Sequence, residues 1–280
     1  MRERVCACLL LLSPALLRGQ IAREPDAREI VRRSVAAEDK SQQIRRNYTY
    51  KSLNVVRESD SGGKVRSTRS TLSEVLFVGG RPFRYVLERD GKPLPAEEGA
   101  KARATLDAAV NEAAHLSPAE RKIREEQYVK STAKRRDLYN NIPDAFNFRI
   151  VGQRSIDGRD TWEMRASPNH DYKGPFASAF HNMEGTLWID KNDYQWVKVE
   201  ADSLETISFG WILARIGKGS RLTIENMRLN NELWAPRRLT IHASGRVALV
   251  KKLNADQETT YSDYRKFQTD SKLVDYEPAK

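Results

Sequence analysis

The chain has 280 residues, of which 31% are charged and 39% hydrophobic, and its formal net charge is +10. This length is ample for one domain with a core of its own. Both cysteines, Cys6 and Cys8, fall within the first 20 residues. A chain that lost this segment would therefore have no disulfide, no cysteine nucleophile and no thiolate metal site.

Residues 1–20 have the pattern of a secretory signal. Arg2 and Arg4 precede an apolar run that is shorter than the roughly 20 residues of a membrane span. We therefore expect a periplasmic protein. The alternative is an uncleaved signal that anchors the chain to the inner membrane, because segment 17–19 does not have the small-x-small pattern of a cleavage site.

The charges of the chain predict what its surface meets in that compartment. Basic residues are interspersed with acidic ones and form no single basic block. For an exported protein of this kind we expect contact with anionic lipid headgroups at a membrane surface, or with an acidic protein partner. We expect no binding of nucleic acid.

The next predicted elements are one helix and a run of strands. Segment 24–46 has a narrow apolar stripe at helical spacing. Strands are predicted at 48–56, 65–78 and 83–87, because hydrophobic and polar residues alternate there between glycine-rich turns. The chain therefore begins, after its signal, with a helix followed by β-hairpins.

Segment 95–141 interrupts the strand pattern with two predicted helices. Ser117 and Glu120 form a capping box around Pro118, which marks the start of the second helix. Pro143 is predicted to end that helix. We interpret the pair as a helical insertion on the rim of the sheet, which is either a solvated flap or a lid or docking arm.

The C-terminal half is predicted to be an antiparallel sheet of sequential hairpins. Strands resume at 146–150 and, after a loop at 168–183, segment 184–267 alternates hydrophobic and polar residues between turn signals. With the earlier strands this predicts a mainly β (α+β) fold in a single domain, residues 21–280. Residues 268–280 lack periodicity, and we expect a flexible tail there.

The five tryptophans all lie in predicted strands. Strict alternation places Trp188 opposite Ile189, and it places Trp196 on the same side as Lys198. The strand around Trp211 is apolar on both faces and requires cover on both. Two interpretations stay open, namely a packed two-layer core and a half-closed sheet whose sheltered face holds an acyl chain or lipid.

No motif in the chain indicates catalysis. The four histidines are not at metal-ligand spacing. The turn at 217–220 lacks the first glycine of a phosphate loop, and no Gly-x-Ser-x-Gly nucleophile elbow is present. We therefore expect no enzymatic activity, no metal and no cofactor. A hydrolase that uses His170 in the loop 168–183 is a further alternative.

Several short motifs have counterparts in a known family. They are segment 185–190 followed by 194–199, the Trp-x-Pro segment 233–237, the Arg-Pro segment 77–83 and the ending Tyr261-x-x-Tyr264-x-x-Phe267. This combination resembles the bacterial outer-membrane lipoprotein-sorting family of LolA-like and LolB-like periplasmic proteins. The helical insertion, the length and the absence of a lipobox depart from the family pattern.

The resemblance implies a fold, and it implies one residue role. The implied fold is an incomplete antiparallel β-barrel or curved sheet covered by helices, with an apolar cavity between them. In carriers of this type an arginine helps to hold the helical lid shut, and the resemblance assigns that role to Arg81. It also implies that the cargo is a lipid or the acyl chains of a lipoprotein.

From these observations we predict a non-enzymatic periplasmic carrier that binds lipid, acyl chains or lipoprotein in an apolar cavity of a half-barrel. The alternative is a periplasmic sensor or interaction module that binds a protein partner through the helices at 95–141. The residues predicted to bind the ligand are Arg81, Trp188, Trp196, Phe209, Trp211 and Trp234.

Overall fold

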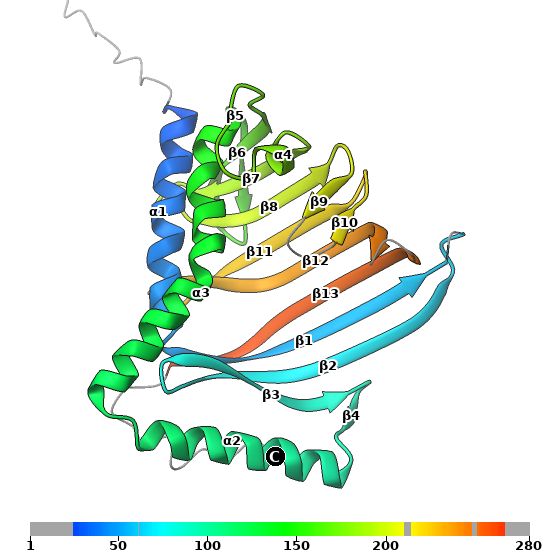
Figure 1. Ribbon diagram of the computed structural model, residues 1–280. Coiled ribbons are helices and arrows are strands. Elements are labelled where there is room, and N and C mark those ends of the chain that lie inside the picture. The colour runs from blue at the N-terminus through cyan, green and yellow to red at the C-terminus, as the bar shows by residue number, and fades with distance from the viewer. Residues whose placement is uncertain (1–24, 61, 210–213, 248–250, 267–280) are drawn as a thin grey trace, which may run out of the picture.

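The computed structural model describes residues 25–60, 62–209, 214–247 and 251–266 (Figure 1). The predicted signal (1–20) and the predicted tail (268–280) lie outside these ranges. The described helices are α1 Ala27–Arg45, α2 Ala96–Ala114, α3 Pro118–Ala145 and the single-turn α4 Ala177–Phe180. Within the described ranges, no helix combines the length and the apolar character that crossing a membrane requires.

The strands make one antiparallel sheet. They are β1 Tyr48–Ser59, β2 Val65–Val78, β3 Arg81–Arg89, β4 Lys92–Pro93, β5 Phe146–Ile156, β6 Arg159–Pro168, β7 Met183–Asp190, β8 Trp196–Ser203, β9 Ile207–Phe209, β10 Ala214–Ile216, β11 Arg221–Leu229, β12 Leu233–Val247 and β13 Lys251–Lys266. Their main order is β4-β3-β2-β1-β13-β12-β11-β8-β7-β6-β5. In addition, β10 pairs with the end of β12, and β9 pairs with β10.

This strand order leaves the sheet open. β4 and β5 stand at its two edges, while β1 and β13, which are distant in sequence, pair at its centre. Figure 1 shows the strands as a curved, unclosed surface with helices beside it. The predicted mainly β fold, a curved antiparallel sheet covered by helices, is therefore confirmed.

α1 and the end of α3 pack on one face of the sheet, which we call the inner face. Val31 of α1 is fully buried in one cluster with Met164 and Leu187 of the sheet. Ile44, near the end of α1, packs against the buried Tyr48 of β1. In Figure 1, α1 and α3 lie side by side across one end of the strands.

α2 packs on the opposite face, which we call the outer face. Val75 pairs with Tyr50, which lies two residues from the inward-facing Tyr48, so Val75 is also on the inner face. Its neighbour Leu76 therefore points outward, where it packs with Leu106 of α2. Leu106 is only 2% exposed. α2 therefore contacts the sheet along one stripe, while most of its other residues are exposed.

α3 runs through Pro143, so the prediction that this proline ends the helix was wrong. The proline lies in the last turn of α3 and is itself buried. Leu138, Tyr139 and Ile142 pack against the inner-face core. The free energy gained by burying these side chains outweighs the one backbone hydrogen bond that a proline removes. This tertiary contribution cannot be seen in the local sequence pattern.

Candidate ligand-binding site

One end of the inner face is covered by helices and forms the main core. Trp196 of β8 lies there and is 5% exposed. Its indole Nε1 donates a hydrogen bond to Ser34 Oγ of α1 at 2.6 Å. Its ring meets Tyr139 of α3 edge-on, with 5.4 Å between the ring centroids. Trp196 therefore joins both helices to the sheet.

A β-bulge in β8 decides the direction in which Trp196 points. Trp188 of β7 pairs with Lys198 of β8. The next pair is Ile189 with Trp196, which leaves Val197 as an extra residue in β8. Trp196 therefore shares the inner face with Ile189. The prediction that Trp196 lies on the same side as Lys198 was wrong, because alternation read from a sequence assumes an unbroken register.

Trp188 and Trp234 lie on the outer face, each beside a cation. Lys198 Nζ stands 5.0 Å from the centroid of the Trp188 ring. The neighbours of Trp234 in β12 pack inward against Tyr48, so Trp234 points outward. There the Arg159 guanidinium lies 5.7 Å from its ring centroid, and its Nε1 donates to Asp193 Oδ2 at 2.9 Å. Both residues are buried, and a cation lies against the ring of each.

The other predicted site residues have different surroundings. Arg81 starts β3 and is exposed. It pairs with Val78, whose side chain packs with α2, so Arg81 stands on the outer face. Phe209 is the last residue of β9, but the structure does not describe its side chain. Trp211 is not among the described residues. The predicted set is therefore divided between the two faces, with Trp196 alone of its described side chains on the inner one.

The inner face carries two rows of apolar side chains at the end away from α1. Val199 of β8 pairs with the inward-facing Leu187. Across the next two strands it is followed by its register partners Ile224 and Leu239. A second row lies two residues away from the first on each strand. Together the six residues, which we call the apolar rows, are Val199, Ile224, Leu239, Ala201, Leu222 and Ile241.

The apolar rows lie beside the helix-covered core without belonging to it. All six side chains are half-buried, and Val199 packs at the edge of the core. Among the described residues, none of the three buried apolar clusters includes Leu222, Ile224, Leu239 or Ile241. Large aliphatic side chains set side by side on an open sheet face are suited to shelter an apolar ligand.

Next to the apolar rows the inner face becomes aromatic and polar. Tyr50 of β1 contacts Tyr261 and Tyr264 of β13, with ring centroids 5.9 and 5.2 Å apart. Tyr261 and Tyr264 are three residues apart, so strict alternation would place them on opposite faces. A bulge at Asp263, where φ is 51°, turns both rings inward. We call Tyr50, Tyr261 and Tyr264 the tyrosine cluster.

Burial controls the ionisation of the tyrosine cluster. Desolvation raises the pKa of Tyr50, of Tyr261 and of Tyr264, because a phenolate is disfavoured away from water. Nearby Arg84 lowers the pKa of Tyr50 and of Tyr261, but this is the smaller influence. The three hydroxyls therefore stay protonated and neutral at physiological pH.

Arg84 of β3 lies on the inner face. It pairs with Val75, which in turn pairs with Tyr50, so all three lie on the inner face. Its Nη1 donates to Ser52 Oγ of β1 at 3.0 Å. Sequence reasoning selected Arg81 and missed Arg84. The odd spacing between them was the available signal, since it sets the two arginines on opposite faces of one strand.

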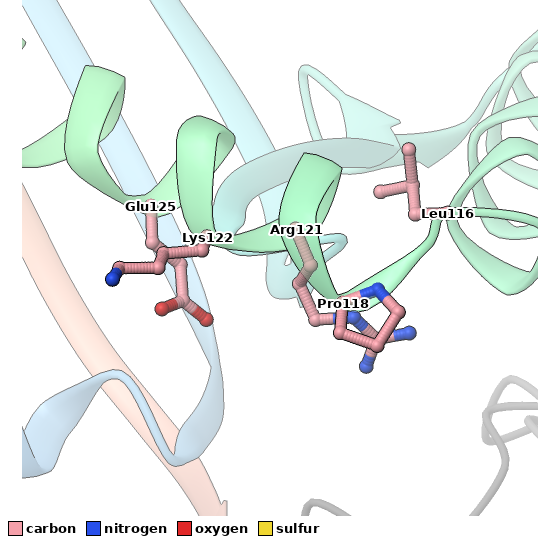
Figure 2. Close-up of a pocket in the computed structure, with 5 residues that line it drawn as sticks. All are labelled: Leu116, Pro118, Arg121, Lys122 and Glu125. Carbon is pink, nitrogen blue, oxygen red and sulfur yellow. The ribbon is translucent and has the colours of Figure 1, made fainter.

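A separate hollow lies at the corner between α2 and α3 (Figure 2). It has a volume of 350 Å³ and is lined by Leu116, Pro118, Arg121, Lys122 and Glu125. Figure 2 shows the charged side chains of the first turns of α3 along it. Its mostly charged lining makes it a poor match for an acyl chain.

The loop at 168–183 brings two histidines together. The rings of His170 and His181 lie 5.2 Å apart, and His181 Nε2 is 3.0 Å from the carbonyl oxygen of Tyr172. In the part of the chain that the structure describes, no group of three or more His, Cys, Asp or Glu side chains is placed to hold a metal ion.

Comparison with known proteins gives a likeness in shape alone. No family model matches the chain, and no curated protein matches its sequence. Solved structures do match. One is a Vibrio parahaemolyticus domain assigned to outer membrane lipoprotein sorting, at 12% identity and a TM-score of 0.35 over 86% of this chain and 94% of that one.

Two further solved structures show the same degree of likeness. A DUF1329 family protein from Desulfovibrio piger has 13% identity and a TM-score of 0.36, over 86% of this chain and 94% of that one. A LolA superfamily protein from Nitrosomonas europaea has 11% identity and a TM-score of 0.33, over 84% and 94%. The matches include the family that the sequence motifs resemble. Scores this low carry no argument about function.

Proposed function

We propose that this protein is a non-enzymatic periplasmic carrier that shelters the acyl chains of a lipid or lipoprotein on the inner face of its sheet. The observation that carries the proposal is the pair of apolar rows. They continue the apolar surface of the core beyond the helices that cover it. A soluble protein gains little from such a surface unless something apolar covers it.

The size of the expected effect is set by the number of methylenes buried. At about 0.8 kcal/mol per buried methylene, a chain segment of about ten methylenes gains ~8 kcal/mol, which corresponds to a micromolar dissociation constant before the cost of ordering the ligand. A long acyl chain is a ligand that can bury this many methylenes.

The test is direct detection of a bound lipid. The protein would be recovered from a periplasmic extract and measured by native mass spectrometry before and after organic extraction, and then titrated with a fluorescent fatty acid. We expect a removable adduct of lipid mass or saturable uptake of the probe. A clean mass together with no uptake would overturn the proposal.

A matched pair of variants localises the binding. Ile241 lies in the apolar rows, and Thr240, the adjacent residue of β12, points to the outer face. Ile241→Asp places a charge where the acyl chain would lie, so uptake should fall at least tenfold. Thr240→Asp adds the same charge on the other face and should leave uptake unchanged. Equal effects of the two variants would place the ligand elsewhere.

The alternative, a module that docks a protein partner through α2 and α3, is a distinct outcome of the same measurements. A clean mass would favour it. In that case Ile123 of α3, which is 53% exposed, is the residue to change. Ile123→Asp would then remove partner binding without changing the stability of the sheet.

A further inference from the structure

We infer that Arg84 and the tyrosine cluster form a second part of the site, which binds the anionic headgroup of the lipid whose acyl chains lie on the apolar rows. This inference rests on the proposed function and narrows its ligand class to lipids with a phosphate or similar anionic headgroup. It concerns the polar part of the inner face, between β3 and β13.

Arg84 is placed to meet an anion. It is exposed, and its recorded hydrogen bond goes to a neutral hydroxyl, that of Ser52. Other arginines on these strands have carboxylate partners, as Arg69 has with Glu58 and Arg89 with Glu98. None of the ion pairs recorded among the described residues involves Arg84. A guanidinium has five N–H donors in a planar fork that suits phosphate oxygens.

A buried hydroxyl beside Arg84 lacks a partner. Ser73 of β2 pairs in register with Ser52 on the inner face. Ser73 is 0% exposed, and within the described residues its Oγ has no hydrogen-bond partner. A buried polar group left unsatisfied costs about 1–3 kcal/mol. This strand position, next to the register partner that accepts from Arg84, is therefore polar and incompletely satisfied.

The tyrosine cluster adds neutral donors next to the arginine. Tyr261 pairs in register with Ser52, which accepts from Arg84. Tyr50 lies between Val75 and the two tyrosines of β13. Because burial keeps the pKa of Tyr50 and Tyr261 raised, these two hydroxyls donate to an anion without adding negative charge of their own. The hydroxyl of Tyr264 already donates to the carbonyl oxygen of Pro236 at 2.7 Å and only positions the cluster.

The distance between the two parts fits one lipid molecule. Leu239 of the apolar rows pairs with Thr259 of β13, two residues from Tyr261 on the same face. The Arg84 guanidinium reaches Ser52 of β1, and β1 and β12 flank β13. Two strand spacings are about 10 Å. A lipid with its chains on the apolar rows therefore has its headgroup within reach of Arg84.

The experiment compares two lipids that share their acyl chains. Uptake of a fluorescent phosphatidic acid and of the matching neutral diacylglycerol would be measured with the full chain. We expect the wild-type protein to bind the anionic lipid at least tenfold more tightly. Arg84→Gln should remove that preference while leaving the affinity for diacylglycerol unchanged, and Arg84→Lys should restore part of it.

Arg81→Gln is the matched control, because it removes the same charge from the same strand on the outer face. It should leave both affinities as they are. Binding of both lipids without a preference for phosphatidic acid would overturn the headgroup inference and leave the carrier proposal intact. Failure of both lipids to bind would overturn the carrier proposal itself. If inorganic phosphate bound to Arg84 as tightly as phosphatidic acid did, a free-anion site would replace the headgroup site.

Discussion

The covered and the open parts of the inner face are built from the same strands, yet their side chains differ in burial. Under α1 and α3, residues such as Ile189 and Trp196 are buried in the core. Further along the same face, Leu222 and Ile241 are only half-buried. α1 has 19 residues and is therefore about 28 Å long, which covers one end of the strands. The proposed site lies where the apolar pattern of the strands extends beyond the helices.

The largest expected effect tests whether Trp196 belongs to the core. Trp196→Ala removes a buried indole, its hydrogen bond to Ser34 and its contact with Tyr139. We expect the free energy of unfolding to fall by about 3–5 kcal/mol, the usual cost of this truncation in a packed core. Urea denaturation followed by far-UV circular dichroism measures the change.

Ile241→Ala is the comparison variant from the open part of the face. A half-buried side chain outside the core should cost about 1 kcal/mol or less when truncated, while lipid uptake falls. If Ile241→Ala destabilised the fold as much as Trp196→Ala, the apolar rows would be core and the proposed surface would not exist. If Trp196→Ala were nearly neutral, Trp196 would be available to a ligand, as the sequence predicted.

Much of the fold could be predicted because local patterns determine it. β2 has the predicted bounds, and the capping box of Ser117 and Glu120 starts α3 as expected. Strand periodicity fails where an extra residue enters. Val197 and Asp263 are bulges, and each breaks the alternation between the residues on its two sides, so Trp196 and Tyr264 could not be placed from alternation.

The candidate site was predicted less well than the fold because it depends on long-range pairing. The pairing of strands such as β1 and β13 cannot be deduced from the sequence of either segment alone. The packing of α2 on the outer face likewise depends on the tertiary contact of Leu106 with β2. The motif that selected Arg81 was local, whereas the placement of Arg84 follows from its register with Val75 and Tyr50.

The second-largest expected effect is a loss of stability at alkaline pH that depends on the tyrosine cluster. Burial raises the pKa of all three phenols in the folded protein. A group with a raised folded pKa contributes stability that is fully present below its unfolded pKa, about 10, and is lost as the pH rises towards the folded value. Each such tyrosine lowers the free energy of unfolding by about 1.4 kcal/mol per pH unit in that window.

Stability measured between pH 9 and 12 separates this cluster from the other tyrosines. The triple variant Tyr50→Phe, Tyr261→Phe, Tyr264→Phe should lose less stability per pH unit than the wild-type protein. Replacing exposed tyrosines elsewhere with phenylalanine should leave the slope of stability against pH unchanged. An unchanged slope in the triple variant would mean that these phenols are solvated, and the polar part of the inner face would then be as open as the apolar rows.

The smallest effect concerns how α3 is brought onto the inner face. The β2–β3 turn passes against α3 at Gly80, where φ is +84° and an added Cβ would lie 2.7 Å from Glu125 Cγ. Gly91 has a similar φ of +70° with nothing within 4 Å of an added Cβ. Gly91→Ala therefore measures the backbone strain alone, about 1 kcal/mol, and Gly80→Ala adds the contact with the helix.

We expect Gly80→Ala to cost about 1 kcal/mol more than Gly91→Ala, because either the Glu125 side chain or the helix must shift. Amide hydrogen exchange should then be faster over the first turns of α3 and unchanged at its end, where Tyr139 contacts Trp196. Equal costs for the two variants would show that this contact does not position α3. The helix would then be held over the inner face by its C-terminal half alone, and its first half would be free to move without uncovering the core.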